Sequence, residues 1–228
     1  MKKIYIIILL FCVNYSFSQE YFSFNDTIYN KKNFDSFLKK KGKKINFKAY
    51  FIPNKSKIVN DSVIKFGTIT FLPKNYELDE IYANLLKPLP YFELEKQKGG
   101  YFNSESLKGK PTIINLWFTN CPTCIDEMPT LNSLKEKYGD KINTIAITFQ
   151  DRGKVFLFNK IYKFDFEILI NANKYIDTLG INGYPKIILL DKNNIIRYIP
   201  FGIVAKEVKS SNFLLQEFNK HIEELIKE

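Results

Sequence analysis

Cys121 and Cys124 lie where a run of strand-forming residues gives way to a helical pattern. The run Thr112–Phe118, TIINLWF, is rich in β-branched and aromatic residues. After the pair, apolar residues return at roughly helical spacing, at Ile125, Met128, Leu131, Leu134 and Tyr138. This order predicts a strand, a tight turn and a helix, with Cys121 at the helix start and Cys124 one turn further in.

A cysteine at a helix start is suited to disulfide exchange. Unpaired backbone N–H groups and the helix dipole favour an anionic sulfur there, so we expect Cys121 to be exposed and reactive. Its thiolate would attack a partner's disulfide to give a mixed disulfide, and Cys124 would then attack Cys121 and release the reduced partner. The sequence therefore predicts Cys121 as the nucleophile and Cys124 as the resolving cysteine.

The first eighteen residues have the order of a secretory signal. Lys2 and Lys3 precede the apolar stretch Ile4–Val13, which is shorter than the about 20 residues that span a bilayer. Small residues follow at the cleavage spacing, in Ser16–Ser18. We expect a signal peptide over residues 1–18 and an exported protein of the periplasm or cell envelope, with a short membrane anchor or a buried strand as alternatives.

Removal of the signal would also remove Cys12 and leave two cysteines and one histidine. A structural zinc site needs four ligands, so it lacks ligands here. A copper site of two thiolates and one imidazole stays open, because soft thiolates select copper. His221, however, lies on the margin of the apolar stripe of a helix predicted over Phe213–Ile226 and capped by Ser210 or Ser211, so we expect a helix-surface residue. We therefore predict no metal and no cofactor, with a copper carrier as the alternative function.

The charge balance favours a solvated surface. The chain has 34 Lys and Arg against 24 Asp and Glu, a formal charge of +10, and its lysines are scattered along the whole length. We find no concentrated basic run with interleaved aromatic residues and no nucleic-acid module, so nucleic acid is not an expected partner. The 45% of hydrophobic residues is enough to bury a core in one domain of ordinary size, with a remainder.

Three segments carry a resemblance to a known family: PYFELEKQKGGYFNSESLKGKPTIINLWF, CPTCIDEMP and GINGYPKIILLDKNNIIRYIPFG. They resemble the TlpA/ResA group of exported, thioredoxin-like thiol-disulfide oxidoreductases. The resemblance implies an α/β, thioredoxin-like fold over residues 90–228, a central mixed sheet flanked by helices, with an extra strand and helix between Ile142 and Leu169. It also implies protein partners with disulfides or cysteines and a membrane electron donor.

The resemblance assigns roles to residues around the cysteine pair. Glu127 is the acidic residue of the C-x-x-C-x-x-E pattern, which could pass protons to Cys124 if it faces the sulfurs. Pro185 would be the cis-proline beside the pair, leaving the backbone of Tyr184 open to pairing with a partner strand. Trp117 would be the active-site tryptophan at the strand end, where it would both pack in the core and contact the bound partner.

Asn120, Pro122 and Thr123 complete the expected partner-binding rim. Asn120 stands where the family commonly has a second tryptophan. The dipeptide Pro122-Thr123 carries no histidine or charge, so we expect a reductase or a mild exchanger rather than a strong oxidant. Asn115 stands where cytoplasmic thioredoxins keep a buried aspartate, which shifts proton transfer toward Glu127.

Residues 19–89 carry no nucleophile, metal cluster or phosphate loop. The segments INFKAYFI, SVIKFGTITFL and YELDEIYANLL predict two or three short strands and a brief helix. We expect a small β-rich accessory unit of unknown function, with an extended arm as the alternative. The boundary is expected at Lys87–Pro90, because its prolines disfavour helix.

Overall fold

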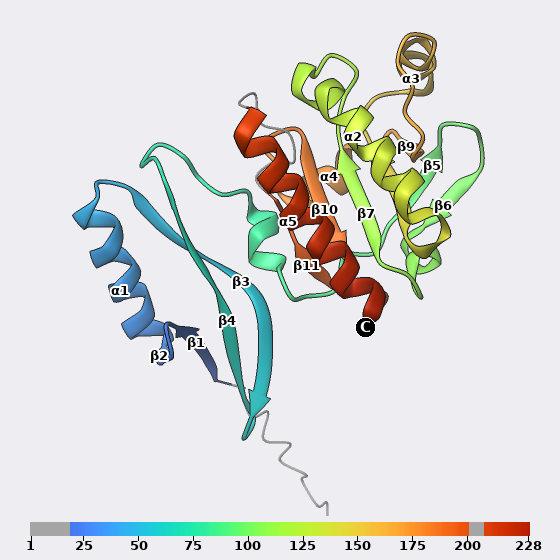
Figure 1. Ribbon diagram of the computed structural model, residues 1–228. Coiled ribbons are helices and arrows are strands. Elements are labelled where there is room, and N and C mark those ends of the chain that lie inside the picture. The colour runs from blue at the N-terminus through green and yellow to red at the C-terminus, as the bar shows by residue number, and fades with distance from the viewer. Residues whose placement is uncertain (1–18, 201–207) are drawn as a thin grey trace, which may run out of the picture.

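The computed structural model describes residues 19–200 and 208–228, with the side chains of the last helix described from Leu215 onward. The expected signal peptide, residues 1–18, lies outside the described residues. The described chain forms a four-stranded sheet in its N-terminal part and a seven-stranded sheet in the rest (Figure 1). None of the described helices has the length and apolar character needed to cross a membrane.

The N-terminal unit pairs its strands in the order β2-β1-β4-β3. Its elements are β1 (Glu20–Phe24), β2 (Thr27–Asn30), α1 (Lys31–Lys44), β3 (Lys48–Val59) and β4 (Ser62–Leu72). Strand β1 runs parallel to β4, while β2 and β3 are antiparallel to their neighbours. Each hairpin turns through an Asn-Asp pair at positive φ, Asn25-Asp26 and Asn60-Asp61, as two-residue hairpin turns require.

The structure confirms the expected β-rich unit: INFKAYFI overlaps β3, SVIKFGTITFL is β4, and YELDEIYANLL contains the short 3-10 helix η1 (Glu80–Asn84). The sequence analysis missed β1, β2 and the 14-residue helix α1, and β3, with 12 residues, is longer than expected. The alternative of an extended arm is wrong, because aromatic packing joins α1 to the sheet. The Phe34 ring stacks on the Phe22 ring at 4.8 Å and meets the edge of Phe51 at 4.9 Å.

The seven-stranded sheet has the order β11-β10-β7-β8-β9-β5-β6. Its strands are β5 (Glu93–Lys96), β6 (Tyr101–Asn103), β7 (Thr112–Leu116), β8 (Asn143–Ile147), β9 (Glu167–Ile170), β10 (Lys186–Leu190) and β11 (Ile196–Tyr198). The central strands β7, β8 and β9 are parallel, and the outer pairings are antiparallel. This mixed sheet confirms the predicted α/β architecture, and the segment Ile142–Leu169, where an extra strand and helix are expected, holds β8, the helix α3 (Arg152–Asn159) and the start of β9.

Helices and 3-10 turns cover both faces of this sheet. The helices are α2 (Pro122–Tyr138), α3 (Arg152–Asn159), α4 (Asn173–Leu179) and α5 (Val208–Lys227), and the 3-10 turns are η1 (Glu80–Asn84), η2 (Ser104–Leu107) and η3 (Gly139–Lys141). One core lies beneath α2, α3 and α5, and the other beneath α4 and η1. All five residues of β7 are buried, since the strand lies between the two cores.

Two details of the helical layer bear on the sequence predictions. Helix α5 begins at Val208 rather than at Phe213, so Ser210 and Ser211 lie within the helix and not at its cap. Residues from η1 to Leu89, namely Ile81, Tyr82, Leu85 and Leu89, are buried in the core beneath η1 and α4. The residues just before the predicted boundary therefore pack with the seven-stranded sheet.

Candidate active site

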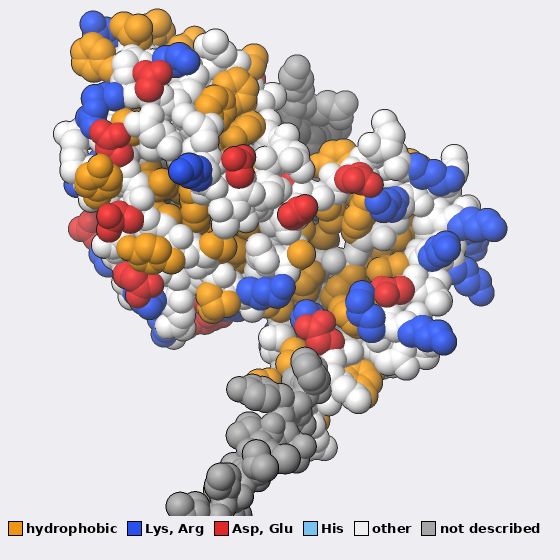
Figure 2. All heavy atoms as spheres, turned by 180° about the vertical axis from the view of Figure 1, so that it is seen from behind, with side chains coloured by type: hydrophobic (Ala, Val, Ile, Leu, Met, Phe, Trp, Pro, Cys, Tyr) orange, Lys and Arg blue, Asp and Glu red, His pale blue; other side chains and the backbone are white. Residues whose placement is uncertain are grey.

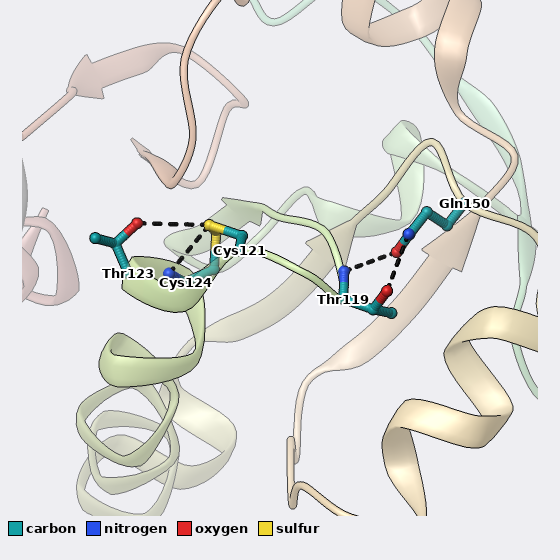
Figure 3. Close-up of a disulfide and its surroundings, with 5 residues drawn as sticks. All are labelled: Thr119, Cys121, Thr123, Cys124 and Gln150. Carbon is teal, nitrogen blue, oxygen red and sulfur yellow. Dashed lines mark hydrogen bonds between the residues drawn. A yellow bond between two sulfur atoms is a disulfide. The ribbon is translucent and has the colours of Figure 1, made fainter.

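A disulfide joins Cys121 and Cys124 at the start of α2, with 5.2 Å between their Cα atoms (Figure 3). Cys121 is the N-cap residue, and its Sγ accepts a hydrogen bond from the Cys124 backbone N–H at 3.2 Å. The Thr123 hydroxyl lies 3.5 Å from the same sulfur. Helix N-terminal N–H groups stabilise negative charge, so this position favours a thiolate at Cys121 once the disulfide is reduced.

The structure corrects the expectation that the Cys121 sulfur is exposed. Cys121 is 3% exposed and Cys124 is 1% exposed. In the oxidised pair both sulfurs belong to the core beneath α2, where Phe118 and Tyr184 pack against the same cluster. The neighbouring residues Asn120, Pro122 and Thr123 are exposed, so the rim around the disulfide, and not the sulfur itself, meets solvent.

Trp117 is also placed differently from expectation. It is fully buried, and its ring packs on Phe158 at 4.9 Å and edge-on to Phe164 at 5.7 Å. A side chain without exposed surface cannot contact a partner, so Trp117 supports the strand end from beneath. Asn115 is likewise buried, and its Nδ2 has no hydrogen-bond partner among the described residues.

Gln150 is a site residue that the sequence reading missed. It follows β8 and is buried, and its Oε1 accepts the Thr119 backbone N–H at 2.7 Å while its Nε2 donates to the Thr119 hydroxyl at 3.0 Å (Figure 3). The carboxyl ends of the parallel strands β7 and β8 meet at this edge of the sheet. The available signal was a polar residue directly after the apolar run of the neighbouring parallel strand. The double contact fixes the turn that leads into Cys121.

The peptide bond between Tyr184 and Pro185 is cis, as the resemblance implies. The Tyr184 ring meets Phe118 edge-on at 5.3 Å, which joins the proline loop to the turn before Cys121. The Phe149 ring lies 6.0 Å from the Tyr184 ring and 5.8 Å from the Phe118 ring, so the three rings form one cluster. Burial raises the pKa of the Tyr184 hydroxyl, with smaller contributions from nearby carboxylates, so this side chain stays neutral.

Glu127 lies on the buried face of α2, together with Cys124, Met128 and Leu131. It is three residues after Cys124, a spacing that places two side chains on the same helix face. The helix therefore places a buried carboxyl group on the side that carries Cys124.

A groove of about 800 Å³ runs beside the disulfide rim. Asn120 and Pro122 form one wall, and Leu157, Ile161 and Tyr162, which are exposed, form the other. Exposed apolar side chains gathered around a groove are typical of protein interaction sites. The groove thus presents apolar surface next to Asn120 and Pro122, which flank Cys121.

The candidate copper ligands Cys121, Cys124 and His221 do not form one site. Within the described residues there is no group of three or more His, Cys, Asp and Glu that could hold a metal ion. His221 is half-buried rather than on the helix surface, and its ring packs on Tyr198 at 4.0 Å. It lines a crevice with Asn54 and Lys55 of the N-terminal sheet, and neither cysteine lines that crevice.

Comparisons with known proteins agree with this geometry. The AhpC/TSA family matches residues 85–199. The chain is 29% identical over 140 residues to the thioredoxin-like protein YneN of Bacillus subtilis, covering 60% of this chain and 82% of that protein. It is 30% identical over 149 residues to the thiol-disulfide oxidoreductase ResA of Bacillus thuringiensis, covering 64% and 86%.

The fold has solved relatives as well. A crystal structure of a thiol:disulfide interchange protein DsbE from Chlorobium tepidum superposes with a TM-score of 0.52 at 19% identity, covering 59% of this chain and 95% of that one. At this identity the likeness shows the thioredoxin fold alone. The family match and the ResA relative carry the assignment: the chain belongs to the AhpC/TSA family and is a ResA-like, thioredoxin-fold thiol-disulfide oxidoreductase.

Proposed function

We propose that the protein is exported and reduces disulfides of envelope proteins through Cys121 and Cys124. The observation that carries this proposal is the position of Cys121 as the N-cap of α2, where its sulfur accepts the Cys124 N–H. A nucleophile held at a helix start with a second cysteine one turn behind it is what disulfide exchange requires. Export is supported by residues 1–18, in which two lysines are followed by an apolar stretch and then by small residues, as in a secretory signal.

The reaction starts from the reduced pair. The Cys121 thiolate attacks one sulfur of the partner's disulfide, that bond breaks, and the partner's other sulfur leaves as a thiolate and takes up a proton. Cys124 then gives its proton to Glu127 and attacks the Cys121 sulfur. The intermolecular bond breaks, and the second partner sulfur leaves and is protonated. The partner gains two electrons and two protons, which a membrane electron donor must resupply to the cysteine pair.

The surrounding residues would bind the partner polypeptide. In this proposal the Tyr184 backbone, next to the cis Pro185, pairs with an extended partner segment by main-chain hydrogen bonds. Asn120, Pro122 and Thr123 form the exposed rim over which that segment passes. The apolar groove beside them would take side chains that flank the partner's cysteine.

The first experiment is the reduction potential of the pair, measured by equilibration in dithiothreitol or glutathione buffers with thiol counting. We expect a value near that of thioredoxin, about −270 mV, because Pro122 and Thr123 add no cation that would stabilise the thiolate further. A value near about −120 mV would make the protein an oxidant and reverse the proposed direction. If no intramolecular disulfide forms at any potential, the redox proposal fails and copper binding is the next property to measure.

Partner trapping tests the substrate class. The Cys124→Ser variant lacks the resolving thiol, so we expect it to accumulate mixed disulfides with envelope proteins through Cys121. The Cys121→Ser variant is the matched control and should trap none. Recovery of no partner with Cys124→Ser, or equal recovery with both variants, would contradict a protein-reductase role.

A further inference from the structure

The lysines are more concentrated than an even spread along the sequence would give. Helix α1 holds seven lysines and one aspartate in 14 residues, a net charge of +6 out of +10 for the whole chain. The lysines are Lys31, Lys32, Lys39, Lys40, Lys41, Lys43 and Lys44. More than half of the formal net charge therefore lies on one helix of the N-terminal unit, outside the match to the AhpC/TSA family.

These lysines are exposed, and few have an anionic partner. All seven are classed as exposed, and the one ion pair of α1 among the described residues joins Lys31 to Asp35 at 3.1 Å. Helix α1 lies on the side of its sheet that faces away from the seven-stranded sheet (Figure 1). Lys and Arg side chains gather along that edge of the molecule in the space-filling view (Figure 2).

The stability of α1 does not explain why it carries so many lysines. Lysines in the last turn suit the helix dipole, but Lys31 and Lys32 stand at the N-terminal end, where the dipole disfavours cations. Lys39 and Lys43, and Lys40 and Lys44, are four residues apart, a spacing at which like charges destabilise a helix. The helix is held instead by its aromatic face, where Phe34 and Phe37 pack on the sheet.

Apolar side chains lie beside the ammonium groups at the carboxyl end of α1. Ile45 is 46% exposed and Phe47 is 42% exposed. A groove of about 650 Å³ is lined there by four lysines, one carboxylate and apolar residues, namely Lys39, Lys43, Lys48 and Lys74 with Asp35, Leu38, Gly42, Phe47 and Ala49. Asp35 pairs with Lys31 and Lys48 pairs with Glu77, so Lys39, Lys43 and Lys74 supply the groove's unpaired charge among the described residues. Cations next to exposed aromatic and aliphatic side chains are the combination that binds the headgroup region of a membrane.

We propose that α1 and this groove dock the protein on a membrane surface rich in anionic phospholipid. Lysine ammonium groups would pair with lipid phosphates, while Ile45 and Phe47 would enter the headgroup layer. Lipid is favoured over nucleic acid because the exposed apolar residues at the site suit a headgroup layer, and no nucleic-acid module is present in the sequence. The proposal rests on the N-terminal unit and is independent of the redox function, since the disulfide belongs to the other sheet.

Vesicle binding by the full chain tests the proposal. Partition would be measured on phosphatidylcholine vesicles with and without phosphatidylglycerol, at low salt and in 0.5 M salt, where screening weakens surface electrostatics. We expect binding that depends on phosphatidylglycerol and falls with salt. A variant with Lys39, Lys40, Lys43 and Lys44 changed to Gln should lose at least tenfold in partition. Gln keeps the helix propensity of Lys, and Lys41 is retained because its ammonium lies over the Phe37 ring.

A matched control removes the same charge elsewhere. Lys98, Lys110, Lys141 and Lys174 are exposed on the thioredoxin-like unit, and their change to Gln should lower partition by less than threefold. Both variants carry the same residues 1–18, so a difference between their partition values reports on α1 alone. Disulfide exchange with dithiothreitol should be unchanged in both variants. Equal losses in the two variants, no dependence on phosphatidylglycerol, or tighter binding to duplex DNA than to the vesicles would each overturn the proposal.

Discussion

Glu127 is the carboxyl group that α2 buries, whereas Asp126 beside it is exposed. The helix places Glu127 on the face that carries Cys124, away from bulk solvent. We propose that this carboxyl group exchanges a proton with the Cys124 thiol. The step that would depend on this transfer is the attack of Cys124 on the mixed disulfide.

We predict that Glu127→Gln slows this resolving step by about 100-fold, the size typical of a lost general acid or base. The first attack by Cys121 should change much less, and the pH dependence of the resolving step should flatten. Single-turnover reduction of a peptide disulfide, with quenching of the mixed disulfide, separates the two steps. Asp126→Asn is the control and should behave as the wild type; an equal effect of both substitutions would contradict the role of Glu127.

At the scale of elements, a buried ion pair joins the segment before η1 to strand β10. The carboxylate of Asp79 lies 2.7 Å from the ammonium of Lys186, and the residues are 6% and 7% exposed. Lys186 directly follows the cis Pro185, so this pair anchors the strand that starts at the proline loop. The Glu80 backbone N–H also donates to the Gly180 carbonyl at 3.1 Å. The two segments approach so closely here that a side chain at Gly180 would clash, because its Cβ would lie 2.5 Å from the Glu80 Cβ.

Removing one partner of the buried Asp79–Lys186 pair should lower the free energy of unfolding far more than breaking an exposed ion pair does. We predict that Asp79→Asn lowers the free energy of unfolding by about 3–5 kcal/mol, because it leaves the Lys186 charge buried and uncompensated. The double variant Asp79→Leu with Lys186→Met should recover most of that loss, since neither charge remains. Urea unfolding of the wild type and both variants measures this.

The exposed pair of Lys48 and Glu77 provides the comparison. Lys48→Gln should cost less than about 1 kcal/mol, as exposed ion pairs contribute little. A similar loss for Asp79→Asn and Lys48→Gln would show that the buried pair does not anchor β10.

At the scale of the whole molecule, packing suggests a boundary earlier than the prolines at Lys87–Pro90. Ile81, Tyr82, Leu85 and Leu89 are buried in the core beneath η1 and α4, and Asp79 pairs with Lys186. Residues 75–89 thus pack with the seven-stranded sheet, although they precede its first strand in the sequence.

A chain that begins at Asn75 should therefore be more stable than one that begins at Pro90. The shorter chain loses four buried apolar side chains, each contributing about 1.5–3 kcal/mol. We expect its unfolding midpoint to be about 10 °C or more lower, since 1 kcal/mol shifts a domain of this size by about 2–4 °C. Thermal unfolding followed by circular dichroism compares the two chains, and equal midpoints would favour the boundary at the prolines.

The sequence by itself determined the features that depend on neighbours along the chain. The periodicity around Cys121 predicted β7, the turn and α2, and the segment SVIKFGTITFL predicted β4. Only a local pattern is needed for these elements, because a strand or helix reveals its buried face within a few residues. The β1–β2 hairpin was missed, although the Asn25-Asp26 pair was a usable turn signal.

Only the tertiary structure decided which distant residues share an environment. It placed Gln150 on Thr119 across 31 positions of sequence, buried the Cys121 sulfur that the sequence predicted to be exposed, and formed the ion pair between Asp79 and Lys186. The seven lysines of α1, in contrast, lie within 14 consecutive residues and could have been recognised in the sequence; the tertiary structure decided only that their helix faces outward. Burial and long-range pairing arise when segments far apart in the chain pack together, and no local pattern of residue types encodes which segments those are.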